Sequence, residues 1–348
     1  MEEEPRGLVD VLEFFRHAHF QIDHWSGGED LFAHVSLLES HWQPVAEFGE
    51  VEDWKERQSV LCDDIEKAFF VDGRMRIYAR ILFGEHVLLL GELLAGYAIW
   101  DKRRGVSMGF SPQKPPSMER VLGVPEGIFQ KKEIRGGVLK LAEGFVFKIE
   151  ESARISRSPQ DVEASQQALF NVLSRLEEQV TQELFHQGIP VIKDGVLHPN
   201  ERLIFQPGIG PVGLVKRIEQ LPLSAERREA LFHLDRGQRT PFLSFLLEEN
   251  FLKVFSYLRL TEKDERFPWK GLVRLEVLLQ KEAWPAMKQE LTCFFDRLAG
   301  LLPRLTADFP WRRLPENIFP IIALEDVLGQ FFASPSWIQY LWVKSVWR

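Results

Sequence analysis

The stretch AFFVDGRMRIYARILF (Ala68–Phe83) surrounds one acidic residue, Asp72, with apolar and β-branched residues. A second run of the same kind, HVLLLGELLAGYAIW (His86–Trp100), follows it almost directly. Runs of this composition predict two neighbouring β-strands. Burying an unpaired carboxylate in such a strand is unfavourable, so Asp72 is expected to be paired, protonated or bound to a cation.

A second acid, Asp194, has the same surroundings in IPVIKDGVL (Ile189–Leu197), where an apolar run also ends in Asp-Gly. Two acids at strand ends, far apart in the sequence, predict a site where strands converge on a hard metal ion, because such ions prefer oxygen ligands. Asp-Gly is also a common turn dipeptide, so a turn is the alternative for either acid taken alone.

The composition is that of a globular protein of one large domain or two ordinary ones, with 348 residues of which 45% are hydrophobic and 27% charged. No apolar stretch is long enough to span a bilayer, and the N-terminus lacks the pattern of a signal peptide. The two cysteines, Cys62 and Cys293, are too few for a disulfide framework or a zinc site. These features predict a cytoplasmic protein without a membrane partner.

The net charge of −8 argues against an extended basic surface for nucleic acid, although it leaves room for a short basic groove. Candidate groove residues form short clusters, and a solvated surface turn is the alternative for each of them. The clusters are Lys102–Arg104, Lys131–Lys132 and Arg227–Arg228.

The predicted elements follow an order that favours one fold. Beyond the two strands above, further strands are predicted at residues 136–152, 189–194, 212–220, 251–260 and 270–279, and helices at 7–20, 53–67, 158–187, 224–234, 283–302 and 323–332. Residues 102–125, which include Gly105, Gly109 and three prolines before Pro125, are predicted to form a loop. Three antiparallel strands before a helix-linked parallel strand are the order of a ribonuclease-H-like α/β core, a mixed sheet flanked by helices.

We therefore expect three regions in the chain. Residues 1–67 form an N-terminal helical extension, residues 68–332 the α/β domain, and residues 333–348 a C-terminal helical addition rich in aromatic residues. The segment WIQYLWVKSVWR (Trp337–Arg348) is interpreted either as a helix folded onto its own core or as a docking surface.

A metal site with two ions needs further ligands. Glu177 lies at the edge of the apolar face of its predicted helix, and a solvent-facing glutamate is the alternative. Asp326 lies in an apolar helix in ENIFPIIALEDVLGQFF (Glu316–Phe332), with its neighbour Glu325 as competitor and an exposed position as alternative. Lys216, after three apolar strand residues, is suited to hold a phosphate or a water, with an edge-strand lysine as alternative.

An ordered set of short motifs resembles the NurA nucleases over roughly Phe69 to Gly329. The motifs are VDGR (Val71–Arg74), LEEQ (Leu176–Gln179), IKDGVL (Ile192–Leu197), GLVKR (Gly213–Arg217), YLRL (Tyr257–Leu260), VRLEV (Val273–Val277) and a final helix led by Phe319-Pro320. Each motif is short, and their order carries the resemblance.

The resemblance implies a ribonuclease-H-like, manganese-dependent DNA nuclease, with Mg²⁺ as the alternative ion. It implies an exonuclease, with single-strand endonuclease activity as a possible addition, that works as a homodimer with a HerA-type hexameric ATPase in DNA end resection. Asp72, Glu177 and Asp194 match the acids of the family, and Lys216 matches its strand lysine.

The sequence departs from the family near its C-terminal end. Archaeal members have a Tyr-Pro segment followed by a histidine on a helix, whereas here Phe319-Pro320 stands in that place and Asp326 is the nearest ligand. The expected chemistry is phosphodiester hydrolysis with two ions about 3.5–4 Å apart. The alternatives are a non-catalytic scaffold or clamp on an ATPase–DNA complex, and an enzyme that acts on RNA.

Overall fold

One mixed β-sheet flanked by helices organises the computed structural model, which describes residues 20–25, 65–128, 137–152, 162–198, 203–216, 218, 223–248, 250–307 and 318–346. This architecture agrees with the predicted class. Hydrogen-bonded strands follow the order β10-β11-β12-β9-β8-β2-β3-β5-β7-β6, with β1 beside β2 and β4 beside β3. Among the helices that the structure describes, none has the length and apolar composition that a membrane crossing requires.

The strands are β1 (Phe20–Trp25), β2 (Lys67–Phe83), β3 (His86–Asp101), β4 (Gly105–Met108), β5 (Ser117–Val124), β6 (Val138–Ala142), β7 (Phe145–Glu151), β8 (Val191–Asp194), β9 (Val212–Val215), β10 (Leu243–Glu248), β11 (Phe251–Arg259) and β12 (Leu272–Gln280). The helices are α2 (Glu163–Phe185), α3 (Ala225–His233), α4 (Trp284–Leu301), α5 (Phe319–Leu328) and α6 (Pro335–Val346). Short 3-10 turns precede and follow α4, at Lys281–Ala283 and Leu302–Leu305.

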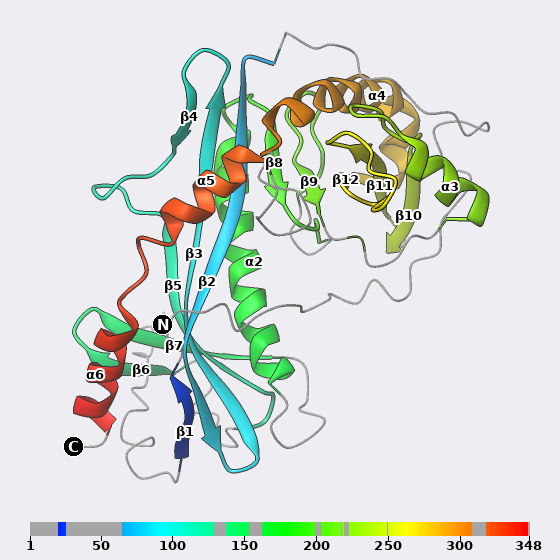
Figure 1. The fold of residues 1–348 in the computed structure, drawn as a ribbon. Helices are drawn as coiled ribbons and strands as arrows, with labels where there is room; N and C mark the ends of the chain where they lie inside the picture. Colours follow the sequence, from blue (N-terminus) through cyan, green and yellow to red (C-terminus); the bar gives the residue numbers. More distant parts are fainter. Residues whose placement is uncertain are drawn as a thin grey trace, which may run out of the picture.

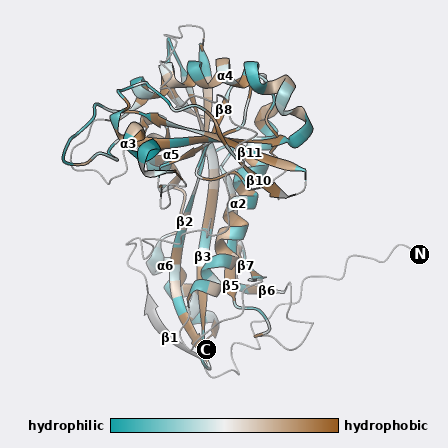
Figure 2. Ribbon diagram, turned by 90° about the vertical axis from the view of Figure 1, so that its right-hand side faces the viewer, coloured by the Kyte–Doolittle hydropathy of each residue, from teal (hydrophilic) through white to brown (hydrophobic). Residues whose placement is uncertain are grey.

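The hairpin of β2 and β3 runs the length of the molecule and joins its two ends (Figures 1 and 2). The strands pair antiparallel from Lys67↔Asp101 to Phe83↔His86. Asp72 and Gly73 pair with Gly96 and Ala95 inside this ladder, so the strand continues through Asp-Gly and the turn alternative for Asp72 is wrong.

The third strand of the antiparallel set differs from the prediction. The segment 102–125, predicted to be a loop, contains β4 and β5, and β5 pairs with β3. Residues 136–152, predicted as the next strand, form the β6–β7 hairpin further out in the sheet. Strand β5 was not predicted because it follows a proline-rich stretch, and clusters of proline and glycine predict a loop.

Helices cover the sheet on opposite faces of β2, with α5 in front and α2 behind in Figure 1. On the α2 side, Leu169 packs so closely that a Cβ at Gly123 would lie 2.1 Å from its Cδ1 atom. On the other side, Leu324 and Leu328 of α5 share a buried cluster with residues of α4 and of β2. The sheet is therefore buried on both faces around Asp72.

The aromatic C-terminal segment folds onto its own core, which was the first of its two predicted interpretations. Helix α6 buries Ile338 and Trp342 completely against strands that include β2 and β6. The opposite side of the helix keeps Trp337, Tyr340 and Val343 exposed.

Several predictions fall outside the described residues. The helices expected at 7–20 and 53–67 lie there almost entirely, as does the expected start of α2 at residue 158. Within the predicted helical extension 1–67, the structure describes β1, which pairs antiparallel with β2 and was not predicted. Lys131 and Lys132 also lie outside the described ranges.

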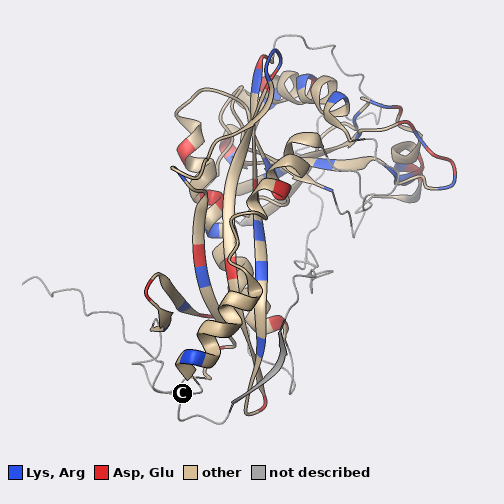
Figure 3. Ribbon diagram, turned by 60° about the vertical axis from the view of Figure 1, so that its left-hand side comes forward, with Lys and Arg blue, Asp and Glu red and all other residues tan. Residues whose placement is uncertain are grey.

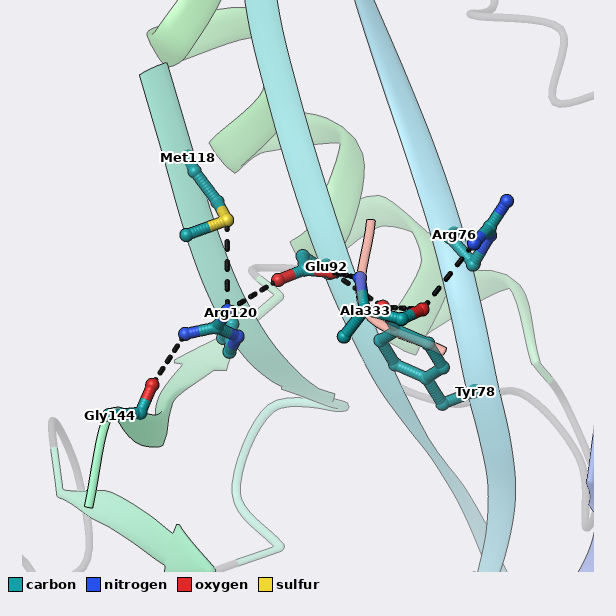
Figure 4. Close-up of polar contacts among 7 residues, drawn as sticks. All are labelled: Arg76, Tyr78, Glu92, Met118, Arg120, Gly144 and Ala333. Carbon is teal, nitrogen blue, oxygen red and sulfur yellow. Dashed lines mark hydrogen bonds and ion pairs between the residues drawn. The ribbon is translucent and has the colours of Figure 1, made fainter. Parts of the chain in front are cut away.

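A buried carboxylate, Glu92 on β3, ties the connection between α5 and α6 to the sheet (Figure 4). It accepts hydrogen bonds from the Tyr78 hydroxyl at 2.5 Å and the Ala333 N–H at 2.9 Å, and pairs with Arg120 at 2.8 Å. Burial and the charge of Glu92 raise the pKa of Tyr78, so its hydroxyl remains a donor. Arg76 donates to the carbonyl of Ala333, and both backbone groups of that residue are thereby held.

We expect Glu92→Gln to lower the free energy of unfolding by about 3 kcal/mol, because it leaves Arg120 without its buried partner. Urea denaturation of the full chain measures this change. The matched control is Glu150→Gln, whose partner Arg175 is 45% exposed, and it should cost less than about 1 kcal/mol. Equal losses for the two variants would contradict a special role for Glu92.

Candidate metal centre

Two of the predicted acids come from adjacent parallel strands. Strands β2 and β8 pair in parallel with Val71 opposite Lys193, so the next residues along each strand, Asp72 and Asp194, lie side by side. Asp72 is only 6% exposed. Its Oδ1 atom accepts the N–H of Gly73 at 2.8 Å, which fixes the orientation of the carboxylate.

A third carboxylate, Glu325 of α5, completes the group. One oxygen from each of Asp72, Asp194 and Glu325 can be chosen so that all three lie within 4.8 Å of one another. No other group of potential metal ligands this compact is found in the part of the chain that the structure describes. The three acids come from three separate elements, and α5 lies across β2 where they meet (Figure 1).

The predicted lysine also reaches this group. Lys216 directly follows β9 and forms an ion pair with Oδ2 of Asp194 at 2.7 Å. Burial lowers the pKa of Lys216, but the charges of Asp194, Asp72 and Glu325 outweigh this effect, and the net shift is upward. The ammonium group therefore stays charged beside the carboxylates.

Burial and neighbouring negative charges disfavour the ionised forms of Asp72 and Glu325. Burial raises the pKa of Asp72 well above its usual range, and the charges of Asp194 and Glu325 add to this effect. Burial also raises the pKa of Glu325, against the opposing charges of Lys216 and Arg74. Lys216 and Arg74 carry fewer positive charges than three ionised acids carry negative ones, and a bound cation would offset the difference.

The donor set fits a divalent cation that prefers oxygen. The Oδ1 atom of Asp194 is buried and has no hydrogen-bond partner in the described part of the chain. Such an atom is unfavourable unless a ligand or an ion satisfies it. Asp72, Asp194 and Glu325 are the residues that would hold a hard ion such as Mn²⁺ or Mg²⁺.

Asp326, the predicted final ligand, is exposed and lies outside the group, and its competitor Glu325 takes that place. The phase of the helix explains the difference. Ile321, Leu324 and Leu328 form the buried stripe of α5, and Glu325 follows Ile321 by one helical turn, whereas Asp326 lies about 100° further round.

Glu177 lies on the other side of β2. Its carboxylate pairs with Lys193 of β8 at 2.9 Å, and a Cβ on Gly73 would come within 2.6 Å of its Oε1 atom. A side chain at position 73 would therefore displace the side chains of Glu177 and Leu173 on α2. The structure does not bring Glu177 into the group of three acids, although its charge contributes to the raised pKa of Asp72.

Sequence reasoning missed Arg74, which holds α5 against the sheet. Its Nη1 atom donates to the backbone carbonyl of Glu325 at 2.6 Å, and the same atom would lie 2.6 Å from a Cβ on Gly329. Arg74 follows Asp72 by two residues on β2, so both side chains project from the same face. The two-residue spacing from Asp72 was therefore the feature of the sequence that could have identified Arg74.

A second missed group fixes the chain just after Asp194. The buried Glu276 of β12 accepts the N–H of Leu197 at 2.7 Å, Lys253 Nζ at 2.9 Å and Arg274 Nη2 at 2.9 Å. Burial alone would raise the pKa of Glu276, but the two cations and the hydrogen bonds outweigh it and hold the pKa below its usual value. The signal was the charged residues inside the apolar runs of β11 and β12.

The basic clusters that the structure describes are exposed, and Arg227 and Arg228 lie in helix α3 and not in the turn that was their alternative. Lys102, Arg103 and Arg104 form an exposed turn whose N–H groups at Arg103 and Arg104 donate to Asp101. Figure 3 shows charged residues of both signs interspersed over the side of the molecule that it presents.

Comparisons with known proteins give similarity of structure but no match of sequence. No protein-family model matches the chain, and no curated protein matches its sequence. The structure is similar to the crystal structure of the NurA nuclease from Sulfolobus solfataricus, with a TM-score of 0.41 and 12% sequence identity over 80% of this chain and 84% of that chain. This neighbour belongs to the family that the sequence motifs resemble.

We expect Glu325→Gln to weaken Mn²⁺ binding at least about tenfold, or roughly 1.4 kcal/mol, because it replaces a charged ligand with a neutral amide. Titration calorimetry on the full chain measures the Kd. The adjacent Asp326→Asn is the matched control and should change the Kd by less than about twofold, or roughly 0.4 kcal/mol. The reverse order of effects would assign the ligand to Asp326.

Raising the pH should destabilise the metal-free protein through Asp72. The pKa of Asp72 is higher in the fold than in the unfolded chain, so protonation stabilises the fold at low pH, and this stabilisation is lost as the pH rises through the folded pKa. The variant Asp72→Asn resembles the protonated form at every pH. Its free energy of unfolding relative to the wild type, measured in EDTA, should therefore increase as the pH rises above about 4, the ordinary pKa of an aspartate. A difference that stays constant with pH would contradict this expectation.

Proposed function

We propose that this protein is a divalent-metal-dependent nuclease that hydrolyses phosphodiester bonds in DNA. The observation that supports this proposal best is the convergence of Asp72, Asp194 and Glu325 beside Lys216. One buried carboxylate, Asp72, and two half-buried ones, Asp194 and Glu325, form an oxygen-rich, negatively charged site beside Lys216 that suits a hard divalent ion. The resemblance of the sequence motifs points to DNA as the substrate.

We infer that the five strands β5-β3-β2-β8-β9 form a ribonuclease-H-like core. Strands β2, β3 and β5 are antiparallel, α2 follows them in the chain, and β8 then pairs in parallel with β2. Strand β9 continues in parallel beside β8. Acids on the first strand and on the helix-linked parallel strand are the arrangement that the sequence predicted for this core.

The residues of the site would have separate roles in binding the metal and the phosphate. Asp72, Asp194 and Glu325 would hold the metal, the N–H of Gly73 orients the carboxylate of Asp72, and Arg74 holds the backbone carbonyl of Glu325. When bound, divalent ions lower the pKa of a coordinated water and stabilise negative charge on phosphate oxygens. Lys216 is charged and adjacent, so it is placed to hold a phosphate oxygen while remaining paired with Asp194.

The finer parts of the proposal rest on the sequence resemblance alone. They are Mn²⁺ as the working ion, with Mg²⁺ as the alternative, and an exonuclease with added endonuclease activity on single strands. They also include a cytoplasmic homodimer that acts with a HerA-type hexameric ATPase in DNA end resection.

The purified full chain should cleave end-labelled linear DNA in Mn²⁺ and lose this activity in EDTA. Asp72→Asn and Glu325→Gln should each reduce the cleavage rate at least about 100-fold, or roughly 2.7 kcal/mol in barrier. Asp326→Asn is the matched control and should stay within about threefold, or roughly 0.6 kcal/mol, of the wild type. Gel electrophoresis of the products, with circular dichroism of each variant, separates lost chemistry from lost folding.

Three outcomes would decide against the proposal. Cleavage that persists in EDTA would contradict the metal mechanism. Binding of DNA without cleavage in either ion, also after addition of the ATPase, would favour the scaffold alternative. Faster cleavage of an RNA of the same sequence would assign the enzyme to RNA.

A further inference from the structure

The loop between β11 and β12, residues 261–271, presents two aromatic side chains to solvent. Trp269 is 61% exposed and Phe267 is 45% exposed, and their rings lie edge to face with centroids 6.3 Å apart. No other large hydrophobic residue in the described ranges is as exposed as Trp269. Leaving a tryptophan in water forgoes a large burial energy, so its exposure calls for a partner.

A completely buried arginine fixes the backbone on both sides of Trp269. The Nη1 atom of Arg259 donates to the carbonyl of Pro268 at 2.8 Å and to that of Lys270 at 2.5 Å. The carbonyl of Trp269 itself accepts the N–H of Leu272 at 3.1 Å. The aromatic residues are therefore held outward on a fixed backbone, which reduces the entropy that a binding partner would have to remove.

The register of the sheet places this loop at the edge where the candidate metal centre lies. Asp194 pairs with Leu214 of β9, and β12 runs antiparallel to β9 with Arg274 opposite Val215. The start of β12 therefore emerges beside the carboxyl ends of β8 and β9, where the yellow loop of Figure 1 lies. Two strand spacings and the rise along β12 separate the loop from Asp194 by roughly 15–20 Å.

The charges of the loop cancel. Lys263, Arg266 and Lys270 are matched by Glu262, Asp264 and Glu265. A loop without net charge has little attraction for a phosphate backbone, and what it offers is an aromatic surface with cations beside it. Bases of any sequence stack on such a surface, provided that they are unpaired.

We propose that Trp269 and Phe267 stack on unpaired bases of a single-stranded segment whose backbone is bound at the candidate metal centre. This proposal rests on the proposed function and adds a substrate contact a few nucleotides from the scissile bond. It commits to a single strand, because the bases of a duplex are already stacked on one another.

Helix α6 supplies a matched control. Trp337 and Tyr340 are 46% and 50% exposed and stack at 5.3 Å, so they resemble the loop aromatics in exposure and in mutual contact. They lie at the opposite end of the long β2–β3 hairpin from the metal centre (Figure 1).

The experiment measures the anisotropy of a labelled oligothymidine of about 20 nucleotides bound to full chains that carry Asp72→Asn to prevent cleavage. Trp269→Ala should weaken binding about tenfold, or roughly 1.4 kcal/mol. Trp269→Phe should restore most of the loss, and Trp337→Ala should have no effect. A blunt duplex should bind both the parent and Trp269→Ala with the same affinity.

An abasic oligonucleotide tests stacking directly. It should bind the parent chain as weakly as the normal strand binds Trp269→Ala, and the substitution should then cause no further loss. An equal loss on normal and abasic strands would overturn the proposal in favour of a backbone contact. A change in oligomeric state by light scattering, without a change in DNA affinity, would assign the loop to a protein partner instead.

The two levels of the proposal fail in different ways. If the wild type binds and cleaves single strands but Trp269→Ala matches it in both, the stacking role is overturned and the nuclease stands. If the wild type neither binds nor cleaves any nucleic acid in Mn²⁺, both are overturned.

Discussion

The structure depends on one electrostatic conflict, in which the parallel pairing of β2 and β8 places Asp72 and Asp194 side by side in a buried region. Asp72 lies buried within β2, and Asp194 is the half-buried last residue of β8, so the sheet itself fixes the positions of both acids. The neighbouring groups respond to this charge. Lys216 pairs with one of the acids, and the pKa of Asp72 rises because burial and its neighbours disfavour the charged form. A divalent cation would resolve the same conflict more completely.

The third acid reaches this position from the far end of the sequence. Arg74 and the carbonyl of Glu325 that it holds are separated by 251 positions, and Glu92 and Ala333 by 241. Two charged residues of the β2–β3 hairpin thus hold the C-terminal segment at two points, at Glu325 itself and at Ala333. The stability of the C-terminal segment and the geometry of the site are consequently linked, although Glu92 does not touch any of the three acids.

Charged groups are also arranged on the other face of the sheet. Lys193 pairs with Glu177 there, and Glu276 accepts bonds from Lys253, Arg274 and the chain that follows Asp194. Lys193 and Asp194 are neighbours on one strand and point to opposite faces, so one of them supports α2 while the other faces α5. Because side chains alternate along β8, Asp194 faces α5, whereas the ion pairs of Lys193 and Glu276 lie on the opposite face of the sheet.

The local sequence determined the elements with the strongest patterns. The long apolar runs of β2 and β3, the helix that ends before Gly188, and the strand that carries Asp194 were all predictable, because their periodicity and end signals lie within each segment. Strand β5 was not predictable, since its short run follows a proline-rich stretch and gains its place only by pairing with β3.

The same division applies to the site. Asp72, Asp194 and Lys216 could be singled out from the sequence, because a charged residue in an apolar strand is conspicuous by itself. The choice between Glu325 and Asp326 could not be made, since neighbouring helical residues differ by about 100° and only the packing of α5 on β2 sets which one faces the acids. Burial of Ile321, Leu324 and Leu328, together with the hold of Arg74, turned Glu325 inward. The sequence alone determined which strand residues are candidates for the site, and the tertiary structure decided which residue of the helix joins them, because helix orientation depends on contacts with distant parts of the chain.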